Sequence, residues 1–216
     1  MKILLLSASP RGHKSQTLFL AKEILNGCSG AESEIIQLHD LQIKFCQHCE
    51  LCHKKILACP LKDDVRLVLN KMMEADGIIL ASPNYIDHIT GALKSFLDRS
   101  SHFIHCLRLL EKYVVGCVTS GSGQDQPVLD YIKHYANICA AQYVGGISSA
   151  AMSVREKMKE AYKLGETLFQ DISEKKVFPD QMKIINEHRE HFRKMMRLAK
   201  DEWPGEYQYW LEKGWL

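Results

Sequence analysis

The feature that most constrains the fold of this chain is a regular alternation of short apolar runs with longer amphipathic segments. Five runs of five to seven mostly apolar residues lie at 2–6, 34–38, 77–81, 113–118 and 142–148. Between and after them, apolar residues recur at helical spacing in segments that begin near Ser15, Asp63, Thr90, Val128 and Ser153, the third forming one long helix through Leu107. Short strands that are apolar throughout are typical of a parallel sheet covered on both faces. We therefore predict an α/β fold with a doubly wound, five-stranded parallel sheet.

Three loops that follow predicted strands are rich in serine, threonine, glycine, asparagine and proline. They lie at 7–17, 82–85 and 119–123. Because the carboxyl ends of parallel strands share one edge of a sheet, we expect these loops to converge there on a ligand.

The first of these loops has the chemistry of a phosphate site. It offers the hydroxyls of Ser9, Ser15 and Thr17, the cation of Arg11 and the amides of a helix N-terminus, which together suit a phosphate monoester. The glycine–lysine spacing of a P-loop is missing, and no Gly-x-Gly-x-x-Gly dinucleotide fingerprint occurs in the chain. A helix capped by a hydroxyl side chain, with no ligand, is the alternative interpretation of this loop.

The eight cysteines fall into two groups. Cys28, Cys106, Cys117 and Cys139 are dispersed, and we expect them to be small buried apolar side chains. Cys46, Cys49, Cys52 and Cys59 follow the spacing Cys-x2-Cys-x2-Cys-x6-Cys, and Pro60 comes directly after the last. Four thiolates at this spacing suit a [4Fe–4S] cluster or zinc. Iron–sulfur is favoured because zinc sites more often use two separated cysteine pairs, although His48 and His53 offer further zinc ligands.

Taken together, the loops resemble a known family. Three motifs carry the resemblance: Ser-x-Ser-Pro-Arg with Ser15-Gln16-Thr17, then Ser82-Pro83-Asn84-Tyr85, then Gly91-x-Leu93-Lys94-x-Phe96-x-Asp98-Arg99. Over roughly residues 1–170 the chain resembles the flavodoxin-like NAD(P)H-dependent FMN reductases. Departures are small, with Gln16 where asparagine is common and His13-Lys14 where glycine and asparagine often stand.

The resemblance implies an FMN site built from the three loops. The FMN phosphate would contact Ser9, Arg11, Ser15, Gln16 and Thr17, and the isoalloxazine ring would contact Pro83, Asn84, Tyr85 and Ile86. The pyrimidine side of the ring would face Thr119, Ser120, Gly121, Ser122 and Gly123.

The resemblance also implies an activity. The iron–sulfur flavoproteins of this family ligate a [4Fe–4S] cluster through a compact motif that Cys46, Cys49, Cys52 and Cys59 match. The expected function is electron transfer from NAD(P)H through FMN to the cluster or to an acceptor, with the flavin carrying the chemistry and no catalytic side chain named. Alternatives are an electron carrier or redox sensor with a protein partner, and a zinc-stabilised flavodoxin-like protein.

The C-terminal part differs in character from the rest. We predict a flavodoxin-like domain over 1–175 with a cysteine-rich insertion at 44–62, and a C-terminal helix with an aromatic tail over 176–216. Trp203, Trp210 and Trp215 all lie in the last fourteen residues. Such a tail must dock, either at an oligomer interface, which we favour, or on its own domain. The histidine pairs 102/105 and 188/191 lack supporting ligands and are interpreted as solvated helix faces.

Charge and composition limit the partners. The 216 residues carry a net charge of only +2, which gives no reason to expect binding to nucleic acid or to an anionic membrane surface. No apolar run approaches the roughly 18–20 residues of a spanning helix, and the N-terminal run is too short for a secretion signal. We expect a cytoplasmic homodimer or homotetramer that meets a small-molecule electron donor and, as a further partner, a redox protein.

Overall fold

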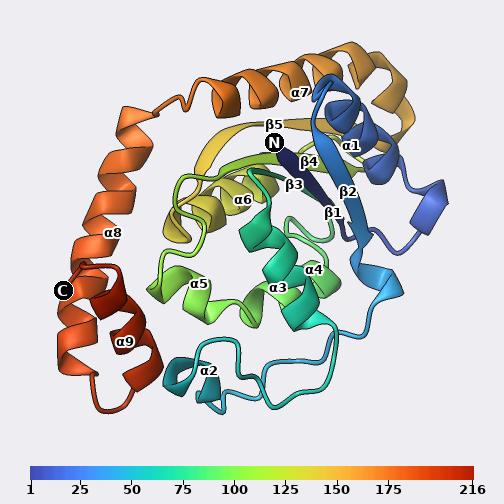
Figure 1. The fold of residues 1–216 in the computed structure, drawn as a ribbon. Helices are drawn as coiled ribbons and strands as arrows, with labels where there is room; N and C mark the ends of the chain where they lie inside the picture. Colours follow the sequence, from blue (N-terminus) through green and yellow to red (C-terminus); the bar gives the residue numbers. More distant parts are fainter.

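The computed structural model describes residues 1–216 and places a parallel sheet at the centre of the molecule (Figure 1). The strands are β1 (Lys2–Ser7), β2 (Glu32–Gln37), β3 (Gly77–Pro83), β4 (Tyr113–Ser120) and β5 (Gln142–Ala150). Every pairing is parallel, and the strand order is β2-β1-β3-β4-β5. This is the flavodoxin-like order, in which the chain reverses direction across the sheet between β1 and β3. The predicted fold class is confirmed.

Helices cover both faces of the sheet. One face carries α1 (Gln16–Gly27) and α7 (Met158–Ser173), and the other carries α3 (Val65–Glu74), α4 (Gly91–Asp98) and α6 (Gln126–Ile138). Along β1, Leu4 and Leu6 belong to one hydrophobic core, whereas Ile3 and Leu5 belong to the other. Both faces of the strand are therefore buried, which explains why its sequence is continuously apolar.

The pair α1 and α7 packs unusually closely at two glycines. A Cβ atom on Gly165 would stand 1.9 Å from the carbonyl oxygen of Ile24, and one on Gly27 would stand 2.1 Å from that of Tyr162. No other residue type fits at either position without separating the two helices.

The single long helix expected from Thr90 is wrong. Thr90 does cap α4, since its Oγ1 accepts a hydrogen bond from the Leu93 amide, but α4 ends at Asp98 and a separate helix, α5 (Ser101–His105), follows. Ser100 Oγ donates to the Leu97 carbonyl at 2.6 Å, a local bond that competes with helix continuation. At this break the Arg99 side chain reaches the cysteine segment, residues 44–62, where it donates to the Lys44 carbonyl and to Cys59 Sγ.

Short elements complete the chain. Three 3-10 helices are η1 (Gly12–Lys14), η2 (Leu38–Asp40) and η3 (Ala151–Lys157), the last forming the start of the helix expected from Ser153. Within the cysteine segment the one helix is α2 (Leu51–Lys54). No helix of the structure combines the length and hydropathy that crossing a membrane requires.

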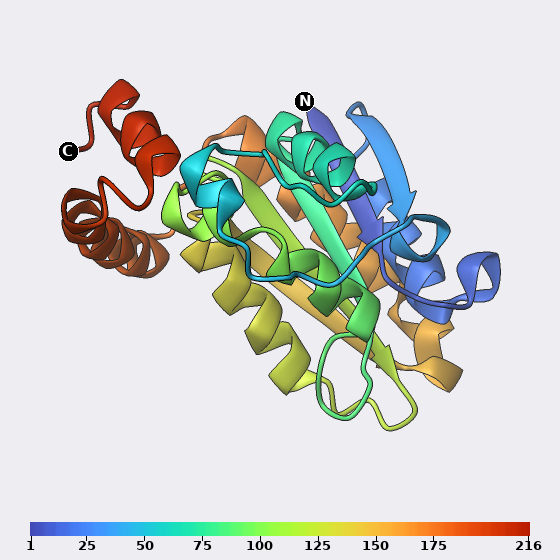
Figure 2. The same ribbon diagram turned by 90° about the horizontal axis from the view of Figure 1, so that it is seen from below.

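The C-terminal tail packs on its own chain, through α8 (Pro179–Leu198) and α9 (Pro204–Glu212), beside α5 and α2 (Figure 2). Its aromatic residues build a third core with Cys106 and Leu107, in which Trp210 is completely buried. Docking on its own domain, the second of the two expected arrangements, is therefore what the structure shows. The domain boundary at residue 175 stays a prediction and falls between α7 and α8.

Candidate functional site

The three loops expected to meet at one edge of the sheet line a single cavity. Its volume is about 230 Å³, and its walls are Ser9, Arg11, Ser15, Gln16, Thr17, Pro83, Asn84, Tyr85, Thr119, Ser120, Gly121 and Ala151. Of the residues proposed for FMN, only Ile86, Ser122 and Gly123 lie outside this lining. Ala151 has no sequence signal, because it is an apolar residue of η3, which follows β5, whereas polar loop residues mark the other three strand ends.

The first loop is held by its own hydroxyl groups. Ser15 Oγ accepts a hydrogen bond from the Leu18 amide at 3.0 Å and so caps α1. Thr17 Oγ1 lies 2.6 Å from Thr119 Oγ1, a buried contact that ties the first loop to the end of β4. The amides of Gln16 and Thr17, in the first turn of α1, have no acceptor within the helix and are available to an anion. Arg11 is exposed at the rim and adds a positive charge.

The second and third loops are joined through Asn84. Its Nδ2 donates to Asp125 Oδ1 at 3.0 Å and to the Gln124 carbonyl at 3.3 Å. Its Oδ1, by contrast, is buried and has no hydrogen-bond partner. Tyr85 is half exposed beside it, and Ile86 is fully exposed with a left-handed φ of 54°.

These features fit FMN. The helix N-terminus and Arg11 suit its phosphate, and the orphaned Asn84 Oδ1 is an acceptor for a ring N–H. Tyr85 offers an aromatic wall for a planar ring. Ile86 is completely exposed, so it could contact a ring only from outside the cavity.

The four clustered cysteines are only partly gathered. Cys52 and Cys59 line a second cavity of about 350 Å³ together with Arg99 and His102, whereas Cys46 and Cys49 are exposed and lie outside it. The four sulfurs do not form a set in which three donor atoms lie within 4.8 Å of one another. Apart from α2 the segment has no regular structure, and it contains three left-handed non-glycine residues, His48, Glu50 and Leu57. Four thiolates in a segment with so little structure of its own suit a metal cluster that would organise it.

Arg99 anchors this segment to the domain. Its guanidinium donates to Asp63 Oδ2 at 2.7 Å and Oδ1 at 3.2 Å, to the Lys44 carbonyl at 2.8 Å and to Cys59 Sγ at 3.2 Å. Burial alone would raise the pKa of the Asp63 carboxyl, but the bonds from Arg99 and the Lys44 amide outweigh it and hold that pKa below its usual range. The sequence contains Arg99 in the family motif without revealing that it donates to a cysteine of the cluster.

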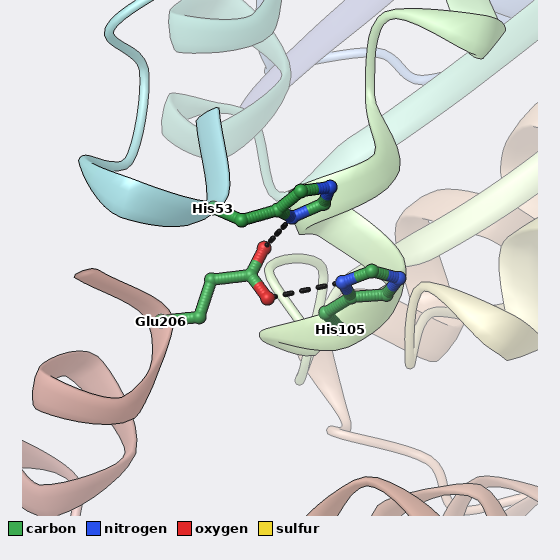
Figure 3. A group of neighbouring side chains, drawn as sticks. All are labelled: His53, His105 and Glu206. Carbon is green, nitrogen blue, oxygen red and sulfur yellow. Dashed lines mark hydrogen bonds and ion pairs between the residues drawn. The ribbon is translucent and has the colours of Figure 1, made fainter. Parts of the chain in front are cut away.

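The interpretation of the histidine pairs as solvated faces is wrong for 102/105. His102 is completely buried, neither ring nitrogen has a partner, and burial lowers its pKa to about 4. His105 Nδ1 lies 3.0 Å from Glu206 Oε2, and His53 Nδ1 lies 2.7 Å from Glu206 Oε1 (Figure 3). Of the other pair, His191 is exposed and His188 is half-buried. Glu206 was missed because it lies 101 residues from His105 and 153 from His53, with no local motif to mark it.

The same contact bears on the zinc alternative. His53 Nδ1 lies 2.7 Å from Glu206 Oε1, and His48 is largely exposed and pairs with Glu50 at 3.5 Å. No set of three donor atoms within 4.8 Å of one another combines either histidine with a cysteine sulfur.

Comparison with known proteins agrees with this picture. A sequence profile of the family described as NADPH-dependent FMN reductase matches residues 1–156. An iron-sulfur flavoprotein of Archaeoglobus fulgidus is 40% identical over 124 residues, which cover 56% of this chain and 60% of that protein. A second iron-sulfur flavoprotein of that organism is 29% identical over the full length of both chains.

The chain thus spans about 60% of the length of the first relative and all of the second. Among solved structures, the NAD(P)H:quinone oxidoreductase from Methanothermobacter marburgensis shares the fold with a TM-score of 0.61, at 17% identity over 78% of this chain and 96% of that one. The profile match covers well over half of the 216 residues. This chain therefore belongs to the NADPH-dependent FMN reductase family.

Proposed function

We propose that this protein is an FMN-dependent oxidoreductase that takes electrons from NAD(P)H, and that its cysteine segment holds a [4Fe–4S] cluster that exchanges electrons with the flavin. The observation that carries the proposal is the single cavity in which the loops after β1, β3 and β4 meet, in a chain of the FMN reductase family. FMN, when bound, accepts an electron pair from a nicotinamide and releases electrons singly or together.

The residues of the cavity would divide the work between the two ends of FMN. Ser9, Arg11, Ser15, Gln16 and Thr17 would hold the phosphate. The ring would rest on Pro83, Asn84, Tyr85 and Ile86, with Thr119, Ser120, Gly121, Ser122 and Gly123 along its pyrimidine edge. Asn84 lines the cavity and its Nδ2 is held by Asp125, so Oδ1 is the amide atom left to accept a hydrogen bond from a ring N–H.

Cys46, Cys49, Cys52 and Cys59 would ligate the cluster through thiolates. Support comes from the spacing of the four cysteines and from the Arg99 guanidinium beside Cys59 Sγ. It also comes from two relatives described as iron-sulfur flavoproteins, one aligned over part of this chain and one over its full length. The Arg99 guanidinium places a hydrogen-bond donor at 3.2 Å from the sulfur of one proposed ligand. A cytoplasmic location and a homodimeric or homotetrameric state stay predictions. Light scattering, which measures the mass of the assembly, tests the oligomeric state.

The flavin part of the proposal is tested by a matched pair of substitutions. Arg11→Gln removes the cation that lines the cavity, and Lys14→Gln removes an equally exposed cation that does not. A hydrogen bond to a charged group contributes about 1.5–3 kcal/mol, so Arg11→Gln should weaken FMN binding by roughly 10- to 100-fold. Fluorescence titration of flavin-free protein measures this, and equal affinities in the two variants would contradict the phosphate site.

The cluster part is tested by oxygen-free purification with assays for iron and acid-labile sulfide. The wild type should carry about four of each per chain, with a broad absorbance near 400 nm that dithionite bleaches. Cys49→Ser should lose most of the iron, whereas Cys139→Ala, a buried position outside the segment, should keep it. Bound flavin without iron in the wild type would refute the cluster, and the protein would then be a flavin reductase that lacks one.

A further inference from the structure

One group of side chains outside the FMN cavity brings three potential metal ligands to a point. His53 comes from α2, His105 from α5 and Glu206 from α9, and their donor atoms all lie within 4.8 Å of one another (Figure 3). Both imidazoles turn Nδ1 toward the same carboxylate, at 2.7 Å and 3.0 Å. No other set of three histidine, cysteine or carboxylate donors in the molecule converges this closely.

The carboxylate of Glu206 is the unusual member of the group. Its side chain is completely buried, and its only ion partners are the two histidines, with no lysine or arginine. Burying an ion costs several kcal/mol unless a counter-charge offsets it. Two imidazoles in their neutral form supply hydrogen bonds but no charge, whereas a bound divalent cation would offset the negative charge fully.

The two rings lie 4.9 Å apart with their planes 16° apart, a separation that two imidazoles sharing one ion allow and that an ordinary ring stack also gives. Zn–N bonds of about 2.0–2.1 Å place a ring centre about 3.2 Å from the metal, so two rings at a tetrahedral angle stand about 5 Å apart. The ring centres of His53 and His105 are 4.9 Å apart. Trp203 stacks on both rings at 5.0 Å and 4.9 Å, and Phe192 stacks on His105 at 4.7 Å. These aromatic walls fix the orientation of the rings.

We infer that His53, His105 and Glu206 form a binding site for one divalent ion of the zinc class, separate from the four cysteines. Two imidazoles and one carboxylate are borderline ligands that suit zinc, whereas calcium and magnesium prefer oxygen ligands alone. Three protein ligands leave a fourth position for water. The site does not depend on the proposed flavin or iron–sulfur chemistry.

The ion would fasten the C-terminal tail to the cysteine segment. At this contact a Cβ atom on Gly205 would stand 2.5 Å from the Lys54 carbonyl oxygen, so α9 already lies directly against the end of α2. Trp210 Nε1 also donates to the His105 carbonyl at 3.0 Å. An ion bound by residues of α9, α2 and α5 would strengthen this contact. It would also hold His53, and therefore the neighbouring Cys52, in place.

The test compares zinc content in full-length protein after equilibration with zinc and removal of unbound metal. His105→Ala removes a ligand that lies outside the cysteine segment, and Glu202→Gln changes an exposed carboxylate of the same tail as a control. The wild type and the Glu202→Gln protein should retain one more zinc per chain than His105→Ala and Glu206→Gln. Equal zinc content in all four proteins would overturn the inference, and Glu206 would then only hydrogen-bond His53 and His105.

A second measurement needs no variant. X-ray absorption at the zinc edge of the iron-loaded wild type should show only nitrogen and oxygen neighbours near 2.0–2.1 Å. Sulfur neighbours near 2.3 Å with no additional nitrogen shell would place the zinc on cysteines and refute the site. If the His105→Ala protein fails to fold, this spectrum decides the question alone.

Discussion

Arg99→Met is the substitution whose effect the structure determines most fully. The Arg99 side chain is 3% exposed and the Asp63 side chain 1% exposed, and two hydrogen bonds join them. Removing the guanidinium leaves the Asp63 carboxylate buried with only the amides of Lys44 at 3.0 Å and Val65 at 3.4 Å as donors. Breaking one side of a buried ion pair typically costs about 3–5 kcal/mol, because an uncompensated charge remains.

That cost is large enough to measure by thermal unfolding. For a chain of this size about 1 kcal/mol shifts the Tm by roughly 2–4 °C, so Arg99→Met should lower it by roughly 6–20 °C. Lys94→Met, which breaks an exposed pair with Asp98 one helical turn away, should cost about 0.5 kcal/mol or less. Circular dichroism on samples of matched flavin and iron content gives both values.

The double variant Asp63→Asn with Arg99→Met separates charge from packing. It removes both charges, so it should recover a substantial part of the stability that Arg99→Met loses. Recovery of nothing, or a Tm drop for Arg99→Met no larger than for Lys94→Met, would refute the reasoning. In that case the guanidinium would contribute as little as a surface cation.

The pair also predicts a pH dependence. Burial opposes ionisation of Asp63, but the bonds from Arg99 and the Lys44 amide hold its folded-state pKa below the unfolded value of about 3.9. Its contribution is therefore complete above about pH 4 and is lost as the pH falls through the lower folded value. The stability difference between the wild type and the double variant should be constant from pH 7 to 5 and shrink below 4; a difference that shrinks above pH 5 would point to another group.

Three further predictions concern packing, helix capping and FMN binding. Gly165→Ala should destabilise the protein by about 1–3 kcal/mol, since the added carbon would stand 1.9 Å from the Ile24 carbonyl oxygen; unchanged urea unfolding would contradict the close packing of α1 and α7. Trp210→Ala should cost about 3–5 kcal/mol because the side chain is completely buried, and its thermal scan should show it; a loss below 1 kcal/mol would mean that the tail is not docked as described. Ser15→Ala should cost about 1 kcal/mol through the lost cap of α1 and should also weaken FMN in a fluorescence titration, and no change in either would exclude both roles.

The core architecture was largely predictable from local pattern. A strand such as Ile3–Leu6, buried on both faces, must be apolar at every position, and this requirement alone distinguishes a parallel sheet from an amphipathic antiparallel one. Once the sheet is parallel, the loops after β1, β3 and β4 must emerge at one edge, so the residues of the cavity followed from sequence order. The exceptions are Ile86, Ser122 and Gly123, which lie outside the lining, and Ala151, which joins it; they depend on how individual loops bend, which composition does not fix.

The division of the helix at Arg99 was not predictable in the same way. Apolar spacing continues from Leu93 to Leu107, and nothing in that spacing shows that Ser100 would bond the Leu97 carbonyl. At the break, the Arg99 guanidinium bonds a buried carboxylate 36 residues earlier in the chain. Local periodicity records which side chains face a core, but it does not record which long-range polar partner outweighs a helical hydrogen bond.

The sequence by itself determined the strands of the sheet, the loops that line the cavity and the cysteine spacing, since each depends on residues close together in the chain. Only the tertiary structure decided that the aromatic tail folds back on its own domain and that Glu206 meets His53 and His105. The physical reason is that a buried polar contact is selected by its partners in space, which come here from elements more than 100 residues apart. No local pattern encodes such a meeting, because the sequence marks His53 only as a possible ligand beside the cysteines and contains nothing that pairs it with His105 or Glu206.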